Sequence, residues 1–121
     1  MWTVEIDDSA AKEFAELPAE MREEMLRVFE MLERQGPQYL PPKLVSKINE
    51  GLWELRIKTG SGISRAFYFT VEKTAIVVTV YVKKTQKIPG RVMERAVKRM
   101  QARSKVEDAK RREKNKKGPA K

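Results

Sequence analysis

Three consecutive stretches in the middle of the chain, at 52–58, 63–71 and 75–83, have the pattern of β-strands. In the first, apolar and charged residues alternate, so the two kinds of side chain lie on opposite faces. The second is rich in aromatic residues, and the third is β-branched almost throughout, which favours a central strand covered on both faces. The connections are short and turn-rich, so the pattern predicts adjacent antiparallel strands.

The segment before these strands predicts a short strand and a helical hairpin. Residues 2–6 alternate between apolar and polar, and Asp7-Asp8-Ser9 then offers side-chain oxygens that can cap a helix. Apolar residues recur at helical spacing up to the stop at Gly36-Pro37: Ala11, Phe14, Ala15 and Leu17 in one helix, and Met21, Met25, Val28, Phe29 and Leu32 in the next. Prolines are frequent in residues 37–50, which we expect to be mainly a loop.

A last helix is expected after Pro89. Its apolar face consists of Val92, Met93, Ala96, Val97 and Met100. Beyond it the chain is nearly all charged, so we expect the helix to fray over 101–112 and the remainder to be disordered. The pattern thus predicts one domain over 1–102, followed by a basic helical extension and disordered tail over 103–121. The fold class is α+β, with an antiparallel sheet of about four strands between the helical hairpin and the C-terminal helix.

Composition excludes several kinds of chemistry. The 121 residues include no cysteine and no histidine. Disulfides, zinc–thiolate sites, thiol nucleophiles and the Ser-His-Asp triad are therefore excluded, and we expect no metal or other cofactor. No apolar run approaches the ~20 residues of a membrane span, and the N-terminal segment does not have the pattern of a signal peptide. A cytoplasmic protein without a membrane partner is the expectation.

Charge is distributed unevenly along the chain, whose formal net charge is +9. Residues 1–36 contain 4 Lys and Arg against 10 Asp and Glu, whereas residues 101–121 contain 9 against 3. The middle, 37–100, has 13 against 4. This polarity suggests an anionic partner for the second half of the chain, for which RNA is the first candidate, although a solubilising charged surface also fits.

Two arginines and one glutamate on neighbouring predicted strands are candidate catalytic residues. Arg56 and Arg65 are held near each other by the intervening turn, and the planar guanidinium can pair bidentately with phosphate oxygens. Glu54 shares a strand face with Arg56, so it can act either as a general base or as a neutralising partner. A structural ion pair is the alternative role for the arginines.

Further candidates gather where the last strand meets the last helix. Crowding of Lys83, Lys84 and Lys87 can lower a lysine pKa and create a base or an acid, or the three can simply contact phosphates. The other candidate RNA contacts are backbone-binding Lys43, Lys47 and Lys58, hydrogen-bonding Gln86, and Tyr68 and Tyr81, which would either stack on bases or belong to the core.

Four motifs in this order resemble the RelE/ParE toxin superfamily, and in particular its HigB-like, phage-derived branch. They are Leu52–Arg56, Gly60, Arg65–Phe69 and Lys83–Pro89, followed by a helix with Ala96 and Arg99 at a matching spacing. The resemblance covers about residues 1–102 and implies the toxin of a type II toxin–antitoxin pair. It implies a metal-independent endoribonuclease that cuts mRNA, often on the ribosome, by attack of the 2′-OH on the adjacent phosphate.

The resemblance also implies partners and roles. The partners would be a helix-turn-helix antitoxin, mRNA and ribosomal RNA, and the basic tail could steer association with the last. Lys84 matches a lysine that recurs in RelE-like toxins. Some relatives instead use histidines and a tyrosine, which this chain lacks at Val92 and Met93. The acid and base therefore remain open, as do two alternatives: a non-catalytic nucleic-acid-binding module and a gyrase-directed toxin.

Overall fold

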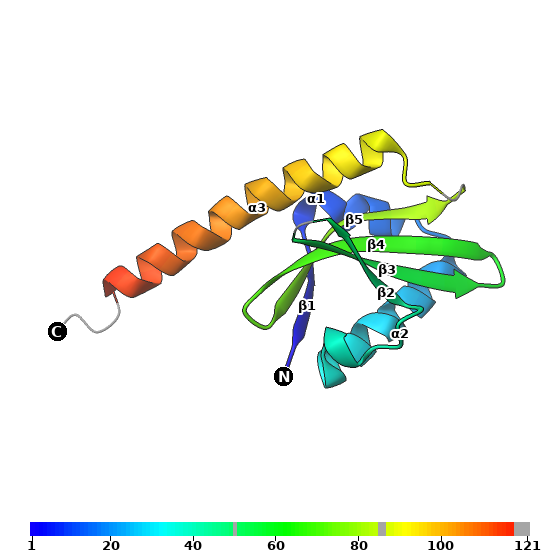
Figure 1. Ribbon diagram of the computed structural model, residues 1–121, viewed down its shortest axis with the longest axis horizontal. Coiled ribbons are helices and arrows are strands. Elements are labelled where there is room, and N and C mark those ends of the chain that lie inside the picture. Colours follow the sequence, from blue (N-terminus) through cyan, green and yellow to red (C-terminus); the bar gives the residue numbers. More distant parts are fainter. Residues whose placement is uncertain (50, 85–86, 118–121) are drawn as a thin grey trace.

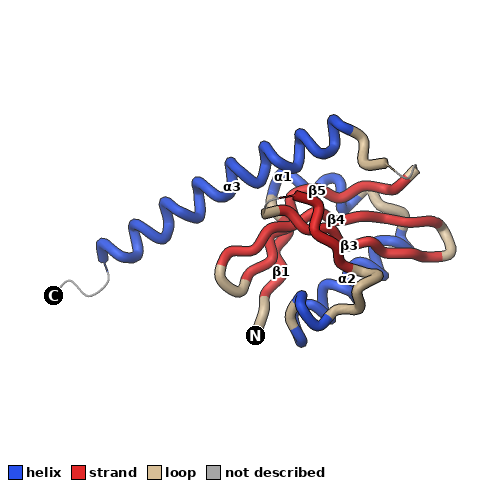
Figure 2. Tube along the Cα trace, viewed as in Figure 1, coloured by secondary structure: helices blue, strands red, loops and turns tan. Residues whose placement is uncertain are grey.

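The computed structural model describes residues 1–49, 51–84 and 87–117. In chain order its elements are β1 (Thr3–Ile6), α1 (Asp8–Ala15), α2 (Ala19–Gln35), a 3₁₀ turn η1 (Pro37–Tyr39), β2 (Val45–Asn49), β3 (Leu52–Thr59), β4 (Gly62–Val71), β5 (Thr74–Lys83) and α3 (Gly90–Lys117). The strands form one sheet in the order β1-β5-β4-β3-β2 (Figures 1 and 2). β1 pairs with β5 in parallel, and the remaining pairs are antiparallel. The predicted α+β class is confirmed.

The sheet differs from the prediction in strand number and order. It has five strands instead of about four, and β4, not the stretch 75–83, lies at its centre. The additional strand, β2, lies within the predicted loop 37–50 and pairs with β3, with Val45 opposite Leu55. Its residues follow the last proline of the segment, Pro42, so each of them keeps the backbone N–H that a strand edge requires.

Both faces of the sheet are covered, which explains the apolar character of β4 and β5. The helical hairpin packs on one face, where Met21, Met25 and Leu32 meet Leu55 and Tyr68. Helix α3 packs on the other face, where Val92 and Ala96 lie against a set of strand residues: Leu52, Phe67, Phe69, Ile76 and Val78. Figure 1 shows α3 crossing the sheet and continuing beyond it. We call these the hairpin face and the α3 face.

A β-bulge in β5 determines which of its side chains reach the α3 face. Phe67 of β4 pairs with Thr79 and Tyr68 pairs with Val77, so Val78 has no partner on β4. Up to the bulge, the even-numbered residues of β5, such as Val78, point to the α3 face. After the bulge, the odd-numbered residues, such as Tyr81, point to that face. The one extra residue thus shifts the alternation of side chains between the two faces by one position in the second half of the strand.

Helix α3 is longer than predicted, because residues 113–117 are helical and not disordered; 118–121 lie outside the described residues. An inner row of arginines ties the helix to the N-terminal segment. Arg95 and Arg99 bind Glu13 of α1 at 2.7 and 2.9 Å, and Arg99 also donates to the Val78 carbonyl at 2.9 Å.

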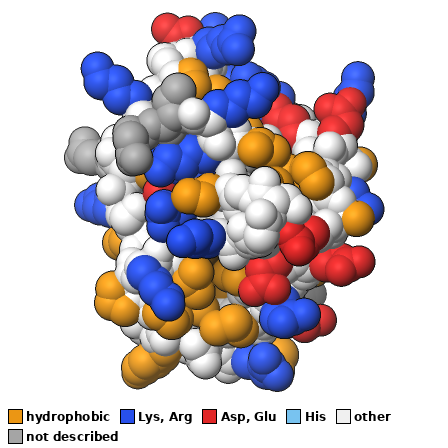
Figure 3. Space-filling view, turned by 90° about the vertical axis from the view of Figure 1, so that its right-hand side faces the viewer, with side chains coloured by type: hydrophobic (Ala, Val, Ile, Leu, Met, Phe, Trp, Pro, Cys, Tyr) orange, Lys and Arg blue, Asp and Glu red, His pale blue; other side chains and the backbone are white. Residues whose placement is uncertain are grey.

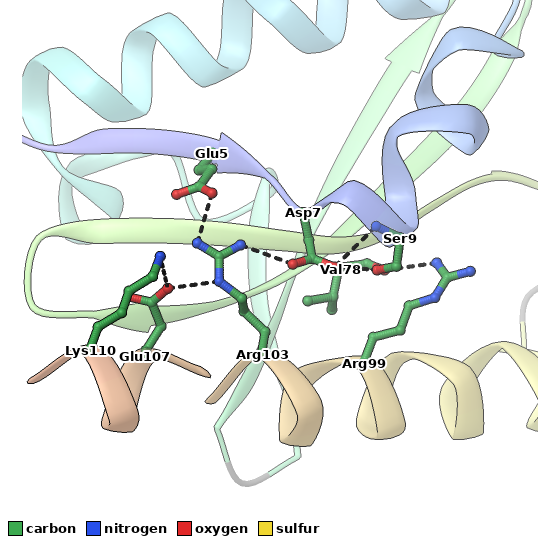
Figure 4. A network of polar contacts seen from close by, with 8 residues as sticks. All are labelled: Glu5, Asp7, Ser9, Val78, Arg99, Arg103, Glu107 and Lys110. Atoms are coloured by element: carbon green, nitrogen blue, oxygen red, sulfur yellow. Dashed lines mark hydrogen bonds and ion pairs between the residues drawn. The ribbon is translucent and has the colours of Figure 1, made fainter. Parts of the chain in front are cut away.

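Arg103 completes this row and meets three carboxylates (Figure 4). Its guanidinium contacts Glu5 at 2.7 Å, Asp7 at 2.9 Å and Glu107 at 2.8 Å. Burial acts to lower the pKa of Arg103, but the hydrogen bonds that it donates to Asp7, Glu107 and Glu5 outweigh burial and raise the pKa. Two of these carboxylates, Glu5 and Asp7, lie nearly 100 residues earlier in the chain, so the local sequence pattern around Arg103 does not reveal them.

Across residues 1–49, 51–84 and 87–117, no helix combines the length and apolar character needed to span a bilayer.

Candidate functional site

The candidate site is built from two rows of side chains that cross β3, β4 and β5 on the α3 face. Cross-strand register places Arg65 directly opposite Arg56 on one side and Tyr81 on the other. Two residues further along each strand, Ile63 lies directly opposite Lys58 on one side and Lys83 on the other. Side chains opposite one another in antiparallel strands are about 5 Å apart at Cβ, so four cations of the prediction share one small area. We call these the cationic rows.

Arg65 and Glu54 form a buried ion pair beneath the rows. Arg65 Nη1 lies 2.7 Å from Glu54 Oε2, and each side chain is only 8% exposed. Ser46 of β2 donates to the other carboxylate oxygen of Glu54 at 3.2 Å. With one oxygen paired and the other hydrogen-bonded, Glu54 balances the buried Arg65. The other cations of the rows, Arg56, Lys58 and Lys83, lie around this pair.

Lys83 has a pKa below the ordinary value for a lysine. Burial lowers its pKa, repulsion from Arg65 and Arg56 lowers it further, and Glu54 acts in the opposite direction. Burial also raises the pKa of the Tyr81 hydroxyl, against the opposing effect of Arg65. A lysine with a lowered pKa is a better proton acceptor near neutral pH than an ordinary lysine, and this was the effect predicted for the crowded lysines.

The remaining lysines of the cluster lie at its rim. Lys84 follows the last residue of β5 and is exposed, and Lys87 is exposed just before α3. Arg56 and Lys83 are half-buried and border solvent. Gln86 lies outside the described residues. The structure thus brings together Glu54, Arg56, Lys58, Arg65, Tyr81 and Lys83, with Lys84 directly beyond the last of them.

Three predicted contacts do not join the rows. Tyr68 is 1% exposed and packs in the core of the hairpin face, where burial raises its pKa to about 12. Lys47 of β2 places its ammonium 6.0 Å from the Trp53 ring centroid, and Trp53 packs on that same face. Lys43 is exposed in the turn before β2. A ligand lying on the rows would therefore not meet Tyr68 or Lys47.

Two features of the site were missed from the sequence. Ser46 lies in the segment predicted as a loop, so its hydrogen bond to Glu54 was not foreseen. The bulge at Val78 brings Tyr81 and Lys83 onto the face of Arg65, and no residue in a run of valines and threonines marks it. The alternation in 52–58, by contrast, correctly placed Glu54, Arg56 and Lys58 together.

Figure 3 shows the end of the molecule that contains the strand ends: Lys and Arg gather on the left of the view, while Asp and Glu lie mostly on the right. Two hollows lie away from the cationic rows, one of them bordered by Met100 and Lys105 of α3. The other, of about 230 Å³, is mostly apolar and lies between Trp2 and Trp53. The described residues contain no group of three or more acidic side chains that could hold a metal ion. An exposed cationic surface of this kind suits a polyanion better than a small molecule.

Comparison with known proteins gives one family and a set of structures. The model of a family described as phage-derived Gp49-like proteins matches residues 12–101. A search of curated proteins gave no match. Among solved structures, a mutant of the E. coli toxin RelE in the free state covers 82% of this chain and 97% of its own, with 19% identity and a TM-score of 0.60.

Two further structures agree with this result. The isolated E. coli RelE toxin covers 83% of this chain and 99% of its own at 20% identity, with a TM-score of 0.55. The toxin–antitoxin complex RelBE2 from Mycobacterium tuberculosis covers 68% and 98% at 16% identity, with a TM-score of 0.54. At such identities the likeness shows a shared fold. The resemblance inferred from the motifs is confirmed for the phage-derived family and for the RelE fold.

Proposed function

This chain belongs to the phage-derived Gp49-like family and has the fold of RelE, and from that premise we propose that it is the toxin of a type II toxin–antitoxin pair. Its activity would be metal-independent cleavage of mRNA in the cytoplasm, on the ribosome. The observation that carries the proposal is the pair of cationic rows, where Arg56, Lys58 and Lys83 surround a neutralised Arg65–Glu54 pair on rigid strands.

Arg56 is suited to bind the phosphate that is attacked. When the 2′-oxygen adds to phosphorus, negative charge accumulates on the non-bridging oxygens, and a fixed guanidinium at that point lowers the barrier. Arg56 is half-buried on β3, where its backbone N–H donates to the Leu44 carbonyl at 2.8 Å and the residue pairs with Arg65 of β4 on the other side. Lys58 and Lys87 would hold the flanking phosphates.

Lys83 and Lys84 would transfer the two protons of the reaction. Lys83 in its neutral form takes the proton from the 2′-OH, a role favoured by its lowered pKa. Lys84, exposed and cationic, gives a proton to the departing 5′ oxygen. The P–O5′ bond breaks as the O2′–P bond forms, which leaves a 2′,3′-cyclic phosphate and a 5′-hydroxyl.

Arg65 and Glu54 would act as positioning residues. Each is too buried for extensive contact with RNA, and Glu54 is engaged by both Arg65 and Ser46, which makes a general-base role for Glu54 the weaker alternative. Arg65 instead keeps the electrostatic potential at Lys83 positive and thereby holds its pKa down. Tyr81, half-buried beside Arg65, would offer a ring edge to a base.

The proposed protein partner is an antitoxin with a helix-turn-helix domain. RelE-fold proteins have been solved in complexes whose names identify them as toxin and antitoxin, from M. tuberculosis and from E. coli. An antitoxin for this chain would neutralise the cationic rows or deny RNA access to them, and it would carry acidic residues to do so.

Primer extension on cellular mRNA after brief induction tests the proposal. The wild type should create new 5′ ends within translated frames, and an Arg56→Gln/Lys83→Gln variant should not. A Lys12→Gln/Arg34→Gln variant removes the same charge from the hairpin side and should cut like the wild type.

Two outcomes would count against the proposal. If the wild type creates no new ends, the nuclease function is wrong. Growth arrest without cuts would then indicate gyrase, and RNA binding without arrest would indicate a non-catalytic module. If both double variants lose cleavage equally, the rows are not the site.

A further inference from the structure

Helix α3 carries a second, outward-facing row of cations that no part of the proposed mechanism uses. Arg91, Lys98, Lys105 and Arg112 recur every seven residues, and all four are exposed. Seven residues make nearly two helical turns, so the four side chains lie on one face of the helix and drift only about 20° at each repeat. The outer row extends for about 30 Å along the helix.

The outer row differs from the inner row, which runs along a neighbouring flank of the same helix. Arg95, Arg99 and Arg103 are all engaged with carboxylates of the N-terminal segment or of α3 itself. In the outer row, none of the four cations forms an ion pair with any residue that the structure describes. The inner row stabilises the fold, and the outer row contributes positive charge that the fold does not neutralise.

The inner row also fixes the direction in which the outer row points. Because Arg103 is anchored to β1 and to the cap of α1, α3 is held rigidly at the point where it leaves the sheet (Figure 4). Beyond this anchor the helix projects from the body of the molecule (Figure 1). A rigid row of charges requires less ordering on binding than a flexible tail would.

The outer row begins beside the cationic rows. Arg91 follows Lys87 by four residues, and Ile88 and Tyr81 pack in the same apolar cluster under α3. Two carboxylates, Glu94 and Asp108, lie beside the row, each three residues after one of its cations and four residues before the next. The cations nevertheless continue from the candidate site along the whole helix.

We infer that the outer row of α3 binds the phosphate backbone of RNA and extends the contact of the candidate site with its substrate. This inference rests on the proposed function in naming RNA as the polyanion. Protein interfaces usually contain an apolar centre, whereas the only large apolar side chain exposed on the described part of α3 is Val106, at 48%. Phosphate contacts need charge and no apolar centre, so RNA is favoured over an acidic protein.

The test is a binding titration with a 2′-O-methyl RNA of about 20 nucleotides, long enough to cover both surfaces. Such an RNA lacks the attacking hydroxyl, so binding is measured apart from cleavage. The variant replaces Arg91, Lys98, Lys105 and Arg112 with glutamine in the full chain. The control replaces Lys12, Arg27, Arg34 and Lys73, four exposed cations outside both the rows and α3, and so has the same net charge.

The outer-row variant should bind RNA about 10- to 100-fold more weakly near 0.1 M salt. The steepness of its plot of log K against log salt should also fall by about 3, because four phosphate contacts are lost and each contributes ~0.7. The control should change by less than about twofold. Equal losses in both variants, or no loss in the first, would overturn the inference. So would unchanged RNA affinity combined with lost binding to poly-glutamate, which would identify an acidic protein as the partner.

The proposed nuclease function can fail independently. If the outer-row variant loses affinity while the wild type cuts no mRNA, the row binds RNA but the cationic rows do not cleave it. If the wild type cuts and the outer-row variant keeps full affinity, the nuclease stands and this inference is wrong.

Discussion

Arg65 in the sheet and Arg103 on α3 are both largely buried and ion-paired, yet their surroundings have opposite charge balance. Arg65 has one carboxylate, Glu54, and its neighbours across the strands are further cations. Arg103 has three carboxylates within 3 Å. Acidic residues are in excess around Arg103 and scarce around Arg65. The excess of carboxylates around Arg103 stabilises the fold. The scarcity of carboxylates around Arg65 leaves a positive surface that an anion can neutralise.

Removal of Glu54 should have the largest effect on stability. In Glu54→Ala, Arg65 would remain buried and charged beside Arg56 and Lys83, which should reduce the free energy of unfolding by about 3–5 kcal/mol. Urea denaturation followed by circular dichroism measures this. A Glu54→Leu/Arg65→Met variant removes both charges and should be more stable than the single variant. If the double variant is the less stable one, the buried charge is not the cause.

Loss of Lys83 should have the next largest effect, on cleavage and not on stability. If Lys83 accepts the 2′-OH proton, Lys83→Gln should lower the rate of RNA cleavage by about 100-fold, with a denaturation midpoint close to that of the wild type. A gel assay with a labelled RNA gives the rate. Wild-type cleavage by Lys83→Gln would assign the base to another residue.

Removal of Arg103 should cost less than removal of Glu54, because the carboxylates it leaves can be hydrated again. Glu5 is already 49% exposed, so we expect Arg103→Ala to reduce stability by about 1–2 kcal/mol. Hydrogen exchange should show faster exchange in α3 after residue 103 and unchanged protection in β4. A uniform increase across the sheet would mean that Arg103 stabilises the whole domain.

A smaller effect is expected on the pH dependence of cleavage in Arg56→Gln. Repulsion by Arg56 is one of the causes that lower the pKa of Lys83, so its removal should raise that pKa toward the ordinary 10.5. Because the neutral form of Lys83 is the active one, the alkaline rise of the rate should move to higher pH. An unmoved profile in this variant, with a reduced maximal rate, would show that Lys83 does not titrate in the reaction.

The smallest effect should be on the stability of Arg103→Ala at acidic pH. Burial acts to raise the pKa of Asp7, but hydrogen bonds from Ser9 and Arg103 outweigh it and lower the pKa below the ordinary 3.8. Asp7 therefore contributes stability that is fully present above pH 3.8, and this contribution is lost as the pH falls through the lowered pKa. Stability measured between pH 5 and pH 2 should fall less steeply in Arg103→Ala than in the wild type. Parallel curves would exclude Asp7 as a source of the slope.

Much of the sheet could be predicted from the sequence because alternation reports which face a side chain occupies. It correctly placed Glu54 and Arg56 on one face, and the short turn placed Arg65 near Arg56, which it directly opposes. β2 was missed because a five-residue strand is decided by the edge of β3 that it pairs with, not by its own pattern. The anchoring of α3 through Arg103 was missed because Glu5 and Asp7 lie nearly 100 residues earlier in the chain. The roles assigned to individual site residues remain predictions.

The bulge at Val78 also separates two kinds of constraint within one strand. Upstream of it, β5 residues are selected for fit against α3 and the hairpin; downstream, Tyr81 and Lys83 occupy positions that the regular alternation would have given to apolar residues. Evolution can therefore revise the reactive end of β5 without altering the phase of its packed half. A one-residue deletion at Val78 should therefore remove the bulge without disturbing this end: Thr79 would still lie opposite Phe67 and Tyr81 opposite Arg65, so the reactive side chains should stay on the α3 face.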